Sequence, residues 1–456
     1  MHIHILGICG TFMGGIAHLA RALGHNVTGS DQNVYPPMSD QLEAAGIELR
    51  AGYDPAHLDP SPDLVLIGNA LSRGNDAVEY VLNKGIPYSS GPAWLKRSVL
   101  NGRQVIAVAG THGKTTTTSL ITWMLAANGI KPGYLIGGRA NNFELTAELG
   151  EGKPFVIEAD EYDTAFFDKR SKFVHYKPDI FIINNIEFDH ADIFDSVDRI
   201  RRQFHHAVRI IPGNGLIIAN GDDEEVNSTL KMGCWSRVHT FGSQGAPDSK
   251  LIEQQPESAE RFEIASSELG SIKFSPPIPG VHNAFNTLAA IIACKHVGLE
   301  LAQCLNALDS FKGVKRRLDN YATIDGVALF DDFAHHPTAI RATLRAMRQE
   351  TAVGRLICVL EPRSNTMQDG THSEALKFAF EDADLVFLYE PNDLRWDIRQ
   401  TAVSVGDNCE CFDQIEQIIE AVVSSVRSED RVVIMSNGGF ENFHQRLAAA
   451  LKQQSS

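Results

Sequence analysis

Residues 104–118 read QVIAVAGTHGKTTTT, and this stretch decides the fold. The apolar run ending at Ala109 predicts a buried strand, a loop bounded by Gly110 and Gly113 follows, and a helix is expected from Lys114 to Ala127. Such a loop points backbone N–H groups at a phosphate, and the helix dipole attracts the anion. Compared with the pattern G-x-x-x-x-G-K-[ST], the first glycine is replaced by Val108. The stretch therefore predicts a nucleotide-binding P-loop; a chance strand–turn–helix is the alternative.

Two polar motifs follow further predicted strands. Residues 157–163 read IEADEYD, and four acids within six residues suit a hard cation such as Mg²⁺. Residues 184–190 read NNIEFDH, where a histidine among oxygen ligands would hold a second Mg²⁺ or orient a phosphate. A solvated acidic turn and a capping histidine are the structural alternatives for these two motifs.

The N-terminus repeats the strand–glycine–helix pattern. HIHILG predicts a strand, GICGTFMGG at residues 7–15 follows, and Asp31 lies where a ribose-binding acid is often found. The dinucleotide fingerprint G-x-G-x-x-G fails because Cys9 and Phe12 replace its second and third glycines. A phosphate-binding turn is favoured here over a nicotinamide site.

Four other motifs carry side chains suited to a ligand. HNAFN at 282–286 opens a predicted helix and would read an adenine edge or simply cap the helix. KRR at 315–317 would bring a guanidinium to a phosphoryl group or form a solvated linker. DDFAHHP at 331–337 and EPRSNT at 361–366 follow strands, where ligands bind in parallel sheets.

The order of the elements predicts an α/β protein of three blocks. Strands are expected at HIHILG, NVTGSD and DLVLIG, then at RQVIAVAG, FVIEAD and DIFIINN, and last at ALFDDF, RLICVLEP, DLVFLYEP and RVVIMSN, with helices between them. We expect an N-terminal Rossmann-like domain at 1–101, a central P-loop ATPase-like parallel sheet at 102–312 and a C-terminal Rossmann-like domain at 313–456. A hairpin-rich excursion is expected between Ser236 and Pro279.

Composition limits the function classes. The net charge is −16, which disfavours nucleic-acid binding, and no run of about 18 apolar residues predicts a membrane span. Seven scattered cysteines predict no disulfide framework and fit a reducing cytoplasm. The start of the chain lacks the pattern of a signal peptide.

Taken together, the motifs resemble the Mur ligase family, through GTHGKTTTT, EADEYD, NNIEFDH, HNAFN, KRRLD and DDFAHHPTAI in this order. The resemblance implies ATP as co-substrate and Mg²⁺ held by Thr115, Glu158 and His190. The implied ATP-binding residues are Gly110, Thr111, His112, Gly113, Lys114, Thr115, Thr116, Asn283, Asn286 and Asp331. The implied catalytic residues are Lys114, Glu158, His190, His335, Arg316 and Arg317, with His335 as a base for the amine.

Within that family, the opening residues resemble those of ligases that act on UDP-N-acetylmuramate. The UDP-sugar site implied by this resemblance comprises Gly10, Thr11, Phe12, Met13, Ser30, Asp31 and Asn69, and the acceptor site comprises Arg363, Ser364 and Asn365. AFFDKRSKFVHY, EPRSNTM and MSNGGFENFH resemble the branch that attaches the recycled tripeptide L-Ala-γ-D-Glu-meso-diaminopimelate in one step.

The resemblance thus implies an ATP-dependent ligase acting through an acyl phosphate, as a monomer or weak homo-oligomer without nucleic-acid or membrane partners. A UDP-N-acetylmuramate–L-alanine ligase is the alternative within the family. Two alternatives come from other classes: a P-loop switch that binds nucleotide without ligation, and a nicotinamide-dependent oxidoreductase.

Overall fold

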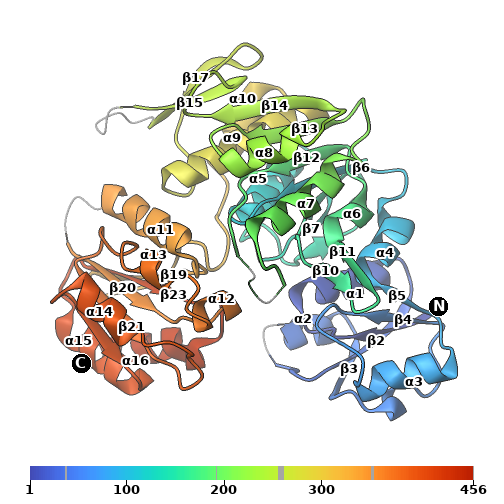
Figure 1. Cartoon of the computed structure of the whole chain (residues 1–456), viewed down its shortest axis with the longest axis horizontal. Helices are drawn as coiled ribbons and strands as arrows, with labels where there is room; N and C mark the ends of the chain where they lie inside the picture. The colour runs from blue at the N-terminus through green and yellow to red at the C-terminus, as the bar shows by residue number, and fades with distance from the viewer. Residues whose placement is uncertain (36–37, 190, 192, 255–260, 351–353, 455–456) are drawn as a thin grey trace. The chain divides into compact units, whose positions relative to one another are not determined.

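The computed structural model describes all residues except 36–37, 190, 192, 255–260, 351–353 and 455–456. The chain has a three-domain α/β fold built on three large sheets (Figure 1). Its contacts divide it into two compact units. One comprises Met1–Glu187, Val197–Phe274 and Phe285–Lys312, and the other comprises Phe188–Ser196, Ser275–Ala284 and Gly313–Ser456.

The N-terminal sheet is parallel, with the order β3-β2-β1-β4-β5. Its elements are β1 (His2–Leu6), α1 (Thr11–Ala22), β2 (Asn26–Asp31), α2 (Met38–Ala44), β3 (Glu48–Ala51), η1 (Pro55–Leu58), β4 (Leu64–Ile67), α3 (Asp76–Lys84), β5 (Tyr88–Ser90), α4 (Gly91–Leu95) and η2 (Lys96–Leu100). The predicted strands β1, β2 and β4 are confirmed. The chain turns from one side of β1 to the other between β3 and β4, which makes the loops after β1 and β4 the expected ligand edge.

The central sheet has ten strands in the order β17-β16-β15-β14-β13-β12-β6-β9-β7-β8. Its strands are β6 (Gln104–Ala109), β7 (Gly133–Leu135), β8 (Ala147–Glu148), β9 (Pro154–Glu158), β12 (Ile180–Ile183), β13 (Leu216–Asn220), β14 (Arg237–Gly242), β15 (Ser249–Glu253), β16 (Phe262–Ser266) and β17 (Gly270–Phe274). Its helices are α5 (Lys114–Ala127), α6 (Lys172–Tyr176), α7 (Val197–Val208), α8 (Glu224–Lys231), α9 (Val281–Val297) and α10 (Leu301–Leu308), and a separate hairpin pairs β10 (Asp163–Ala165) with β11 (Asp168–Ser171).

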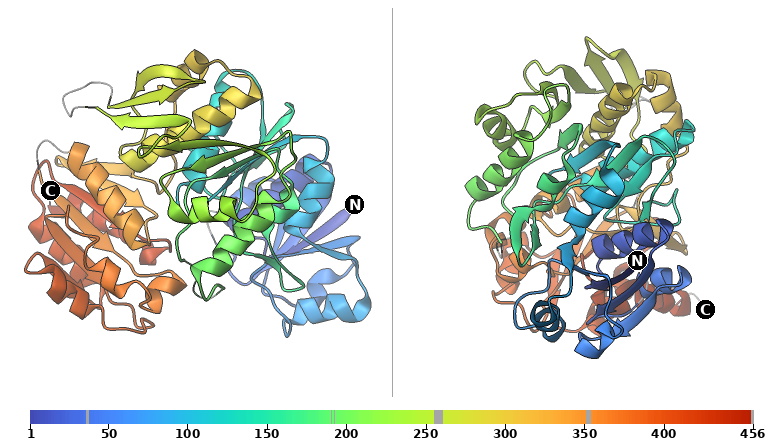
Figure 2. Two further views of the ribbon diagram at one scale, coloured as in Figure 1. Left: turned by 45° about the horizontal axis from the view of Figure 1, so that its top comes forward. Right: turned by 90° about the vertical axis from the view of Figure 1, so that its right-hand side faces the viewer.

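The prediction of a parallel central sheet is wrong at its edges, because the sheet is mixed. β15, β16 and β17, the yellow-green strands in Figure 2, pair antiparallel at one end. At the other end β7 pairs antiparallel with β8. Only three residues join Ser266 to Gly270, too few for the crossover that parallel pairing requires. The strands around the predicted phosphate loop, β6, β9, β12 and β13, are parallel as expected.

The C-terminal sheet has the order β18-β19-β23-β20-β21-β22, and only β18 pairs antiparallel. Its elements are β18 (Asp319–Ile324), β19 (Val327–Asp332), α11 (Pro337–Glu350), β20 (Leu356–Leu360), α12 (Asn365–Gln368), α13 (Ser373–Leu376), β21 (Leu385–Tyr389), α14 (Arg399–Val405), β22 (Cys409–Phe412), α15 (Ile415–Ser425), β23 (Arg431–Met435), η3 (Phe440–Asn442) and α16 (Phe443–Gln454). Alternate residues of β20 face two cores: Cys358 packs with Ile340, and Val359 packs with Ile418. Burial on both faces explains its unbroken apolar sequence.

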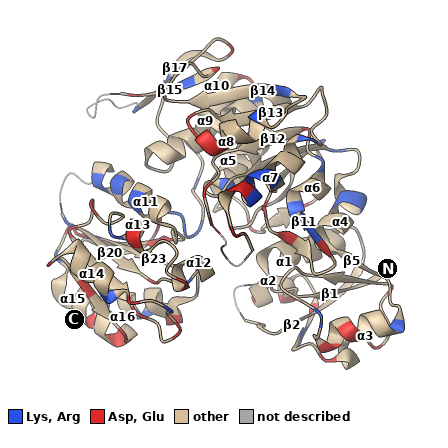
Figure 3. Cartoon of the chain, in the orientation of Figure 1, with Lys and Arg blue, Asp and Glu red and all other residues tan. Residues whose placement is uncertain are grey.

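Charges of both signs are spread over every domain (Figure 3). α11 carries a basic row in which Arg341 pairs with Glu381 and Arg348 with Asp384. Acids of the same domain therefore balance two members of this row. All seven cysteines are free, and no helix among the described residues has the length and apolarity needed to cross a membrane.

Candidate active site

Three loops meet at one edge of the central sheet. β6 lies between β12 and β9, and the three strands run parallel, so the loops after them are neighbours. These loops contain the predicted motifs GTHGKTTTT, EADEYD and NNIEFDH. The sheet therefore gathers three sequence motifs that lie up to about 80 residues apart in the chain.

The backbone of the phosphate loop is held in a conformation that requires glycine. Gly110 and Gly113 have φ values of 140° and 81°, and a Cβ on Gly113 would lie 2.3 Å from Asn286 Oδ1. The N–H of Thr111 donates to Asn185 O at 3.1 Å, and the N–H of His112 donates to Asn185 Oδ1 at 2.7 Å. The loop is thus fastened to the strand end at β12 before any ligand arrives.

Lys114 begins α5 at the centre of this edge and is buried. Its ammonium donates to Gly110 O at 2.7 Å and to Glu161 Oε2 at 3.4 Å, with Asp160 Oδ1 at 4.0 Å. Burial alone would lower the pKa of Lys114, but the carboxylates of Glu161, Asp160 and Glu158 outweigh it and hold the pKa above its ordinary value. The lysine is therefore charged and available to a polyphosphate.

Thr115 and Glu158 form a hard-oxygen pair next to this lysine. Thr115 Oγ1 donates to Glu158 Oε1 at 2.9 Å, and the N–H of Gly137 donates to Glu158 Oε2 at 2.7 Å. Burial and the nearby Asp160 raise the pKa of Glu158, against the opposing effect of Lys114. A buried hydroxyl beside a buried carboxylate, with further acids close by, is a donor set that fits Mg²⁺.

A polar network joins the loop to α9. Asn286 Oδ1 accepts from Thr117 Oγ1 at 3.2 Å and from Asn184 Nδ2 at 3.3 Å, and all three residues are buried. On the outer side of the loop, His112 Nε2 lies 3.2 Å from Glu187 Oε2. Of the implied ATP-binding residues, the structure brings together the loop residues 110–116 and Asn286. Asn283 is also buried, and its amide donates to Pro279 O at 2.8 Å.

The loop after β1 is organised by Asp31. One carboxylate oxygen of Asp31 accepts from the N–H of Cys9 at 2.8 Å, and the other accepts from the N–H of Asn33 at 3.0 Å. Gly10 precedes α1, and Thr11 beside it is exposed, as is Asn69 on the loop after β4. Phe12 is partly buried and Met13 is buried. Asp31 therefore fixes the shape of the loop by accepting hydrogen bonds from backbone N–H groups.

The side chain of Ser30 points into the N-terminal domain. Its Oγ lies 3.0 Å from His4 Nε2 and 3.0 Å from His57 Nδ1, and Ser30 is fully buried. His4 Nδ1 in turn lies 2.8 Å from Thr28 Oγ1. Ser30 is implied for the UDP-sugar site, but its hydroxyl is hydrogen-bonded to His4 and His57 inside the domain.

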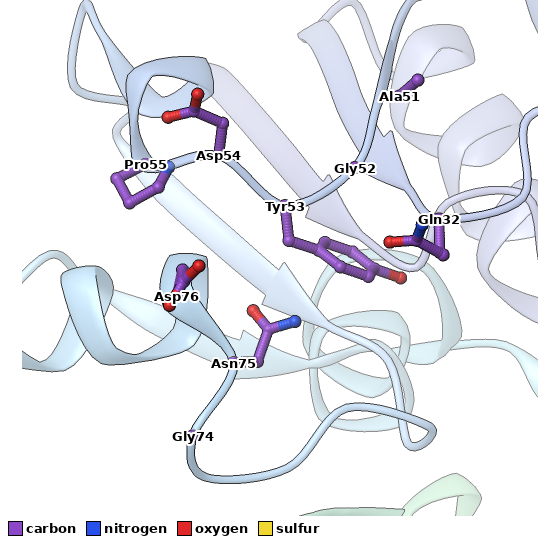
Figure 4. A pocket seen from close by; sticks show the side chains of 9 residues that line it. All are labelled: Gln32, Ala51, Gly52, Tyr53, Asp54, Pro55, Gly74, Asn75 and Asp76. Atoms are coloured by element: carbon purple, nitrogen blue, oxygen red, sulfur yellow. The ribbon is translucent and has the colours of Figure 1, made fainter.

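A cavity of about 590 Å³ lies in the N-terminal domain, lined by residues at or after the ends of β2, β3 and β4. Figure 4 shows the ring of Tyr53 extending toward Gln32, with Asn75 on the loop below. Gln32 directly follows Asp31, so the cavity adjoins the implied UDP-sugar residues. None of the residues that line the cavity is among the predicted site residues, because they come from three separate loops.

The two arginines of KRR lie against Phe333 in the C-terminal domain. Their guanidinium carbons lie 5.1 Å (Arg316) and 4.9 Å (Arg317) from the ring centroid of Phe333. Arg316 also donates to Gly438 O at 2.8 Å, and its Nε lies 3.5 Å from Asp331 Oδ2. Asp331 is 3.1 Å from His444 Nε2 through its other oxygen. Both arginines therefore contact side chains of the C-terminal domain, whereas Lys315 of the same motif is exposed.

His335 lies near the segment 188–196, which packs with the C-terminal domain. His335 Nδ1 is 2.9 Å from Phe333 O, and its Nε2 is 3.8 Å from Asp189 Oδ2. Thr366 Oγ1 donates to Asp189 Oδ1 at 2.9 Å. His190, implied as a metal ligand, is outside the described residues. Asp189 and Thr366 were not among the predicted site residues.

The residues implied for the acceptor site lie after β20. Ser364 caps α12 by accepting from the N–H of Met367 at 3.3 Å, while Arg363 and Asn365 are exposed. A side chain added at Gly438 would come within 3.0 Å of Arg363 Cγ, so Arg363 passes closely over the loop after β23. The three residues are contiguous, and two of them are open to a ligand.

The comparisons with known proteins agree along the whole chain. Three family models match: the Mur ligase family catalytic domain at residues 2–103, the Mur ligase middle domain at 108–294, and the Mur ligase glutamate ligase domain at 316–438. The chain belongs to the Mur ligase family.

Individual relatives are also found. The chain is 51% identical over 455 residues to the UDP-N-acetylmuramate–L-alanyl-γ-D-glutamyl-meso-2,6-diaminoheptandioate ligase of Escherichia coli K12, covering 100% of this chain and 99% of that protein. It is 34% identical to a UDP-N-acetylmuramate–L-alanine ligase of Syntrophomonas wolfei, over 96% of this chain and 94% of that protein. The crystal structure of a murein peptide ligase from Psychrobacter arcticus 273-4 superposes with a TM-score of 0.76 at 44% identity, covering 99% of this chain and 98% of that one.

Proposed function

We propose that this chain is an ATP-dependent ligase that joins the carboxylate of UDP-N-acetylmuramate to the amine of L-Ala-γ-D-Glu-meso-diaminopimelate, in murein recycling. The observation that carries the proposal is the edge of the central sheet, where Lys114 lies in a glycine-bounded loop beside the Thr115–Glu158 pair. This arrangement suits transfer of a phosphoryl group to a carboxylate, which requires the charge of both anions to be offset.

The residues of the phosphate loop have distinct parts in the proposal. Backbone N–H groups at the start of α5 bind the phosphates of ATP, and Lys114 offsets their charge where the bond to the leaving ADP breaks. The donor carboxylate attacks the γ-phosphorus, giving an acyl phosphate and ADP. The amine then attacks the acyl carbon, and inorganic phosphate leaves. Asn286 holds the loop in shape through the network with Thr117 and Asn184.

In the proposal, Thr115 and Glu158 hold Mg²⁺. The family resemblance implies His190 as a further metal ligand. A bound Mg²⁺ supplies a Lewis acid that offsets the charge of the γ-phosphate. The chain's part is to keep a hydroxyl and a carboxylate together in a buried place, which the contact between Thr115 and Glu158 achieves.

The three domains divide the work in the proposal. Residues 1–101 bind the UDP-sugar through the loop after β1 and the adjoining cavity, residues 102–312 bind ATP, and residues 313–456 bind the peptide through Arg363, Ser364 and Asn365. His335 is the proposed base that keeps the attacking amine neutral. Arg316 and Arg317 are proposed to reach the phosphates, and Asp331 to lie near the ribose of ATP.

The choice of acceptor rests on degree of likeness. The relative named for the diaminoheptandioate-containing tripeptide is 51% identical, whereas the relative named for L-alanine is 34% identical. The second candidate is therefore the ligase of free L-alanine, which shares the donor and the chemistry.

The test is phosphate release from Mg-ATP with UDP-N-acetylmuramate, with the tripeptide and L-alanine supplied in parallel. Release with the tripeptide alone is expected. Release with L-alanine alone would move the chain to the second candidate. Nucleotide binding without release on either acceptor would refute ligation and favour a P-loop switch.

A further inference from the structure

Lys172 is a buried cation that the proposed mechanism does not use. It begins α6 directly after the β10–β11 hairpin, and only 5% of its surface is exposed. Its ammonium lies 3.2 Å from Asp160 Oδ2, 4.7 Å from the ring centroid of Phe12 and 5.3 Å from that of Tyr162. One carboxylate and two aromatic faces therefore surround the charge.

These neighbours come from two different ligand loops. Phe12 lies in the first turn of α1, directly after the loop that follows β1, where the UDP-sugar is proposed to bind. Asp160 and Tyr162 belong to the acidic loop after β9, and the second oxygen of Asp160 lies 4.0 Å from the ammonium of Lys114. Lys172 therefore lies between Lys114 and the residues that follow β1. The carboxylate of Asp160 is close to the ammonium groups of both lysines.

Structural stability alone does not account for a lysine here. Burying an ion pair costs about as much desolvation as its attraction returns, so an apolar side chain packed between Phe12 and Tyr162 would join the loops equally well. A cation held at aromatic faces beside a single carboxylate keeps the ability to bind a further anion. Because Asp160 lies close to the ammonium groups of both Lys172 and Lys114, an anion bound at Lys172 would be near a phosphate bound at Lys114.

We propose that Lys172 binds the lactyl carboxylate of UDP-N-acetylmuramate and orients it toward the γ-phosphate of ATP. The inference rests on the proposed function, because it takes its donor from there. In it the ammonium donates to the donor carboxylate while Asp160 remains its second partner, and Phe12 and Tyr162 exclude water from the pair. No covalent step involves the lysine.

UDP-N-acetylglucosamine provides the decisive comparison, because it has the same nucleotide and sugar but lacks the lactyl carboxylate. Binding of both compounds would be measured by calorimetry on the whole chain, for the wild type and for Lys172→Met. A charge-assisted hydrogen bond corresponds to a preference of about 10- to 100-fold for UDP-N-acetylmuramate in the wild type. In Lys172→Met this preference is expected to fall below about threefold, while the affinity for UDP-N-acetylglucosamine is nearly unchanged.

The matched control is Lys169→Met, three residues earlier on β11. Lys169 is 70% exposed and pairs with Asp163 at 2.8 Å, so its loss removes the same charge from an exposed position whose ion pair involves neither Phe12 nor Asp160. This variant is expected to bind both compounds as the wild type does. Steady-state kinetics should show a raised KM for the donor in Lys172→Met and an unchanged KM for ATP.

Two outcomes would overturn the inference. Equal weakening of both UDP compounds in Lys172→Met would mean that the lysine only joins the loops or contacts the diphosphate. A retained preference would mean that another group binds the carboxylate. Lys172→Gln, which stays polar and neutral, takes the place of the methionine variant if thermal unfolding shows that the latter does not fold. Absence of the preference in the wild type would also overturn the inference, whereas absence of phosphate release with the tripeptide would refute the proposed function.

Discussion

The loops after β1 and β6 use one backbone device for two different tasks. Each follows a buried parallel strand, turns at a glycine with positive φ and leads into a helix. The first loop is held by the carboxylate of Asp31, and the second by the backbone and side chain of Asn185. Residues outside each loop thus fix its shape by accepting hydrogen bonds from N–H groups of the loop, from Cys9 in the first and from Thr111 and His112 in the second.

The two loops differ in the charges beside them. The second has Lys114 within hydrogen-bonding distance of Glu161 and beside the Thr115–Glu158 pair, while Asp31 has both oxygens on backbone N–H groups. In the proposed function, each strand–glycine–helix turn binds an anion. The neighbouring side chains determine whether the anion reacts there.

Removing the lysine should give the largest effect, because it makes the second loop resemble the first. Lys114→Met is expected to lower kcat by about 10³-fold, since a preorganised charge on a reacting phosphate contributes on this scale. Phosphate release measures it. Lys131→Met, which removes an exposed partner of Glu151 in the same domain, should leave kcat unchanged. A loss below tenfold in Lys114→Met would contradict the role assigned to the lysine.

Alanine at one glycine of each loop sharpens the comparison of their backbones. Gly113→Ala places a Cβ 2.3 Å from Asn286 Oδ1 at a φ of 81°, and should weaken ATP binding roughly 10- to 100-fold for a strain of about 1–3 kcal/mol. Gly10 has a φ of −67°, and the nearest atom to an added Cβ is 3.6 Å away. Gly10→Ala should therefore cost about 1 kcal/mol or less in unfolding free energy. Calorimetry with ATP and thermal unfolding would be measured for both variants. Equal effects of the two substitutions would contradict the difference in backbone strain between the two glycines.

Asp31→Asn should weaken the binding of UDP-N-acetylmuramate and leave the binding of ATP unchanged. An amide in place of the carboxylate sets one N–H against the backbone N–H of Cys9 or Asn33, at a cost of about 1–3 kcal/mol. We expect KM for UDP-N-acetylmuramate to rise about tenfold while KM for ATP stays the same. A change in KM for ATP of similar size would show that the two loops do not act independently.

The smallest expected effect is on the stability of the fold at low pH. It concerns β1 and β6, the strands that precede the two loops. Burial, with Arg50, His2 and His57 adding repulsion, lowers the pKa of His4 in β1 to about 3, whereas β6 is apolar from Val105 to Ala109. The unfolded state binds a proton below pH 6.5 and the folded state does not, so stability present above 6.5 is lost as pH falls toward 3. The slope is up to about 1.4 kcal/mol per pH unit. Unfolding of the wild type between pH 7.5 and 5 should be steeper than that of His4→Gln; parallel profiles would contradict this.

Local signals made much of the fold predictable. The helix expected from Lys114 to Ala127 has these bounds, because a strand, two glycines and a lysine all mark its start. β3 and β5 escaped prediction because they are short and partly exposed, with sequences ELRA and YSS that lack an apolar run. The antiparallel edges of the central sheet depend on loop lengths, which the apolar pattern of a strand does not report.

The candidate site was predictable in its motifs and less so in its pairings. β2 is buried on both sides after its first residue, so no alternation indicated that the hydroxyl of Ser30 turns toward His4. The contacts of Asn286 with Thr117 and of Thr366 with Asp189 span 169 and 177 residues. Such pairings follow from tertiary packing, which the sequence of either partner alone does not contain.

The segment Phe188–Ser196 has a consequence for dissecting the protein into fragments. It follows β12 of the central sheet, yet it packs with the C-terminal domain, where Asp189 accepts from Thr366 and the ring of Phe188 lies 6.5 Å from that of His372. A fragment expressed from Gly313 onward would retain all six strands of its sheet and lose this covering. Thr366, 2% exposed in the whole chain, would then meet solvent. Residues 188–196 could then be added back as a free peptide to bind the surface that their removal exposes. The C-terminal domain is therefore suited to a fragment complementation experiment.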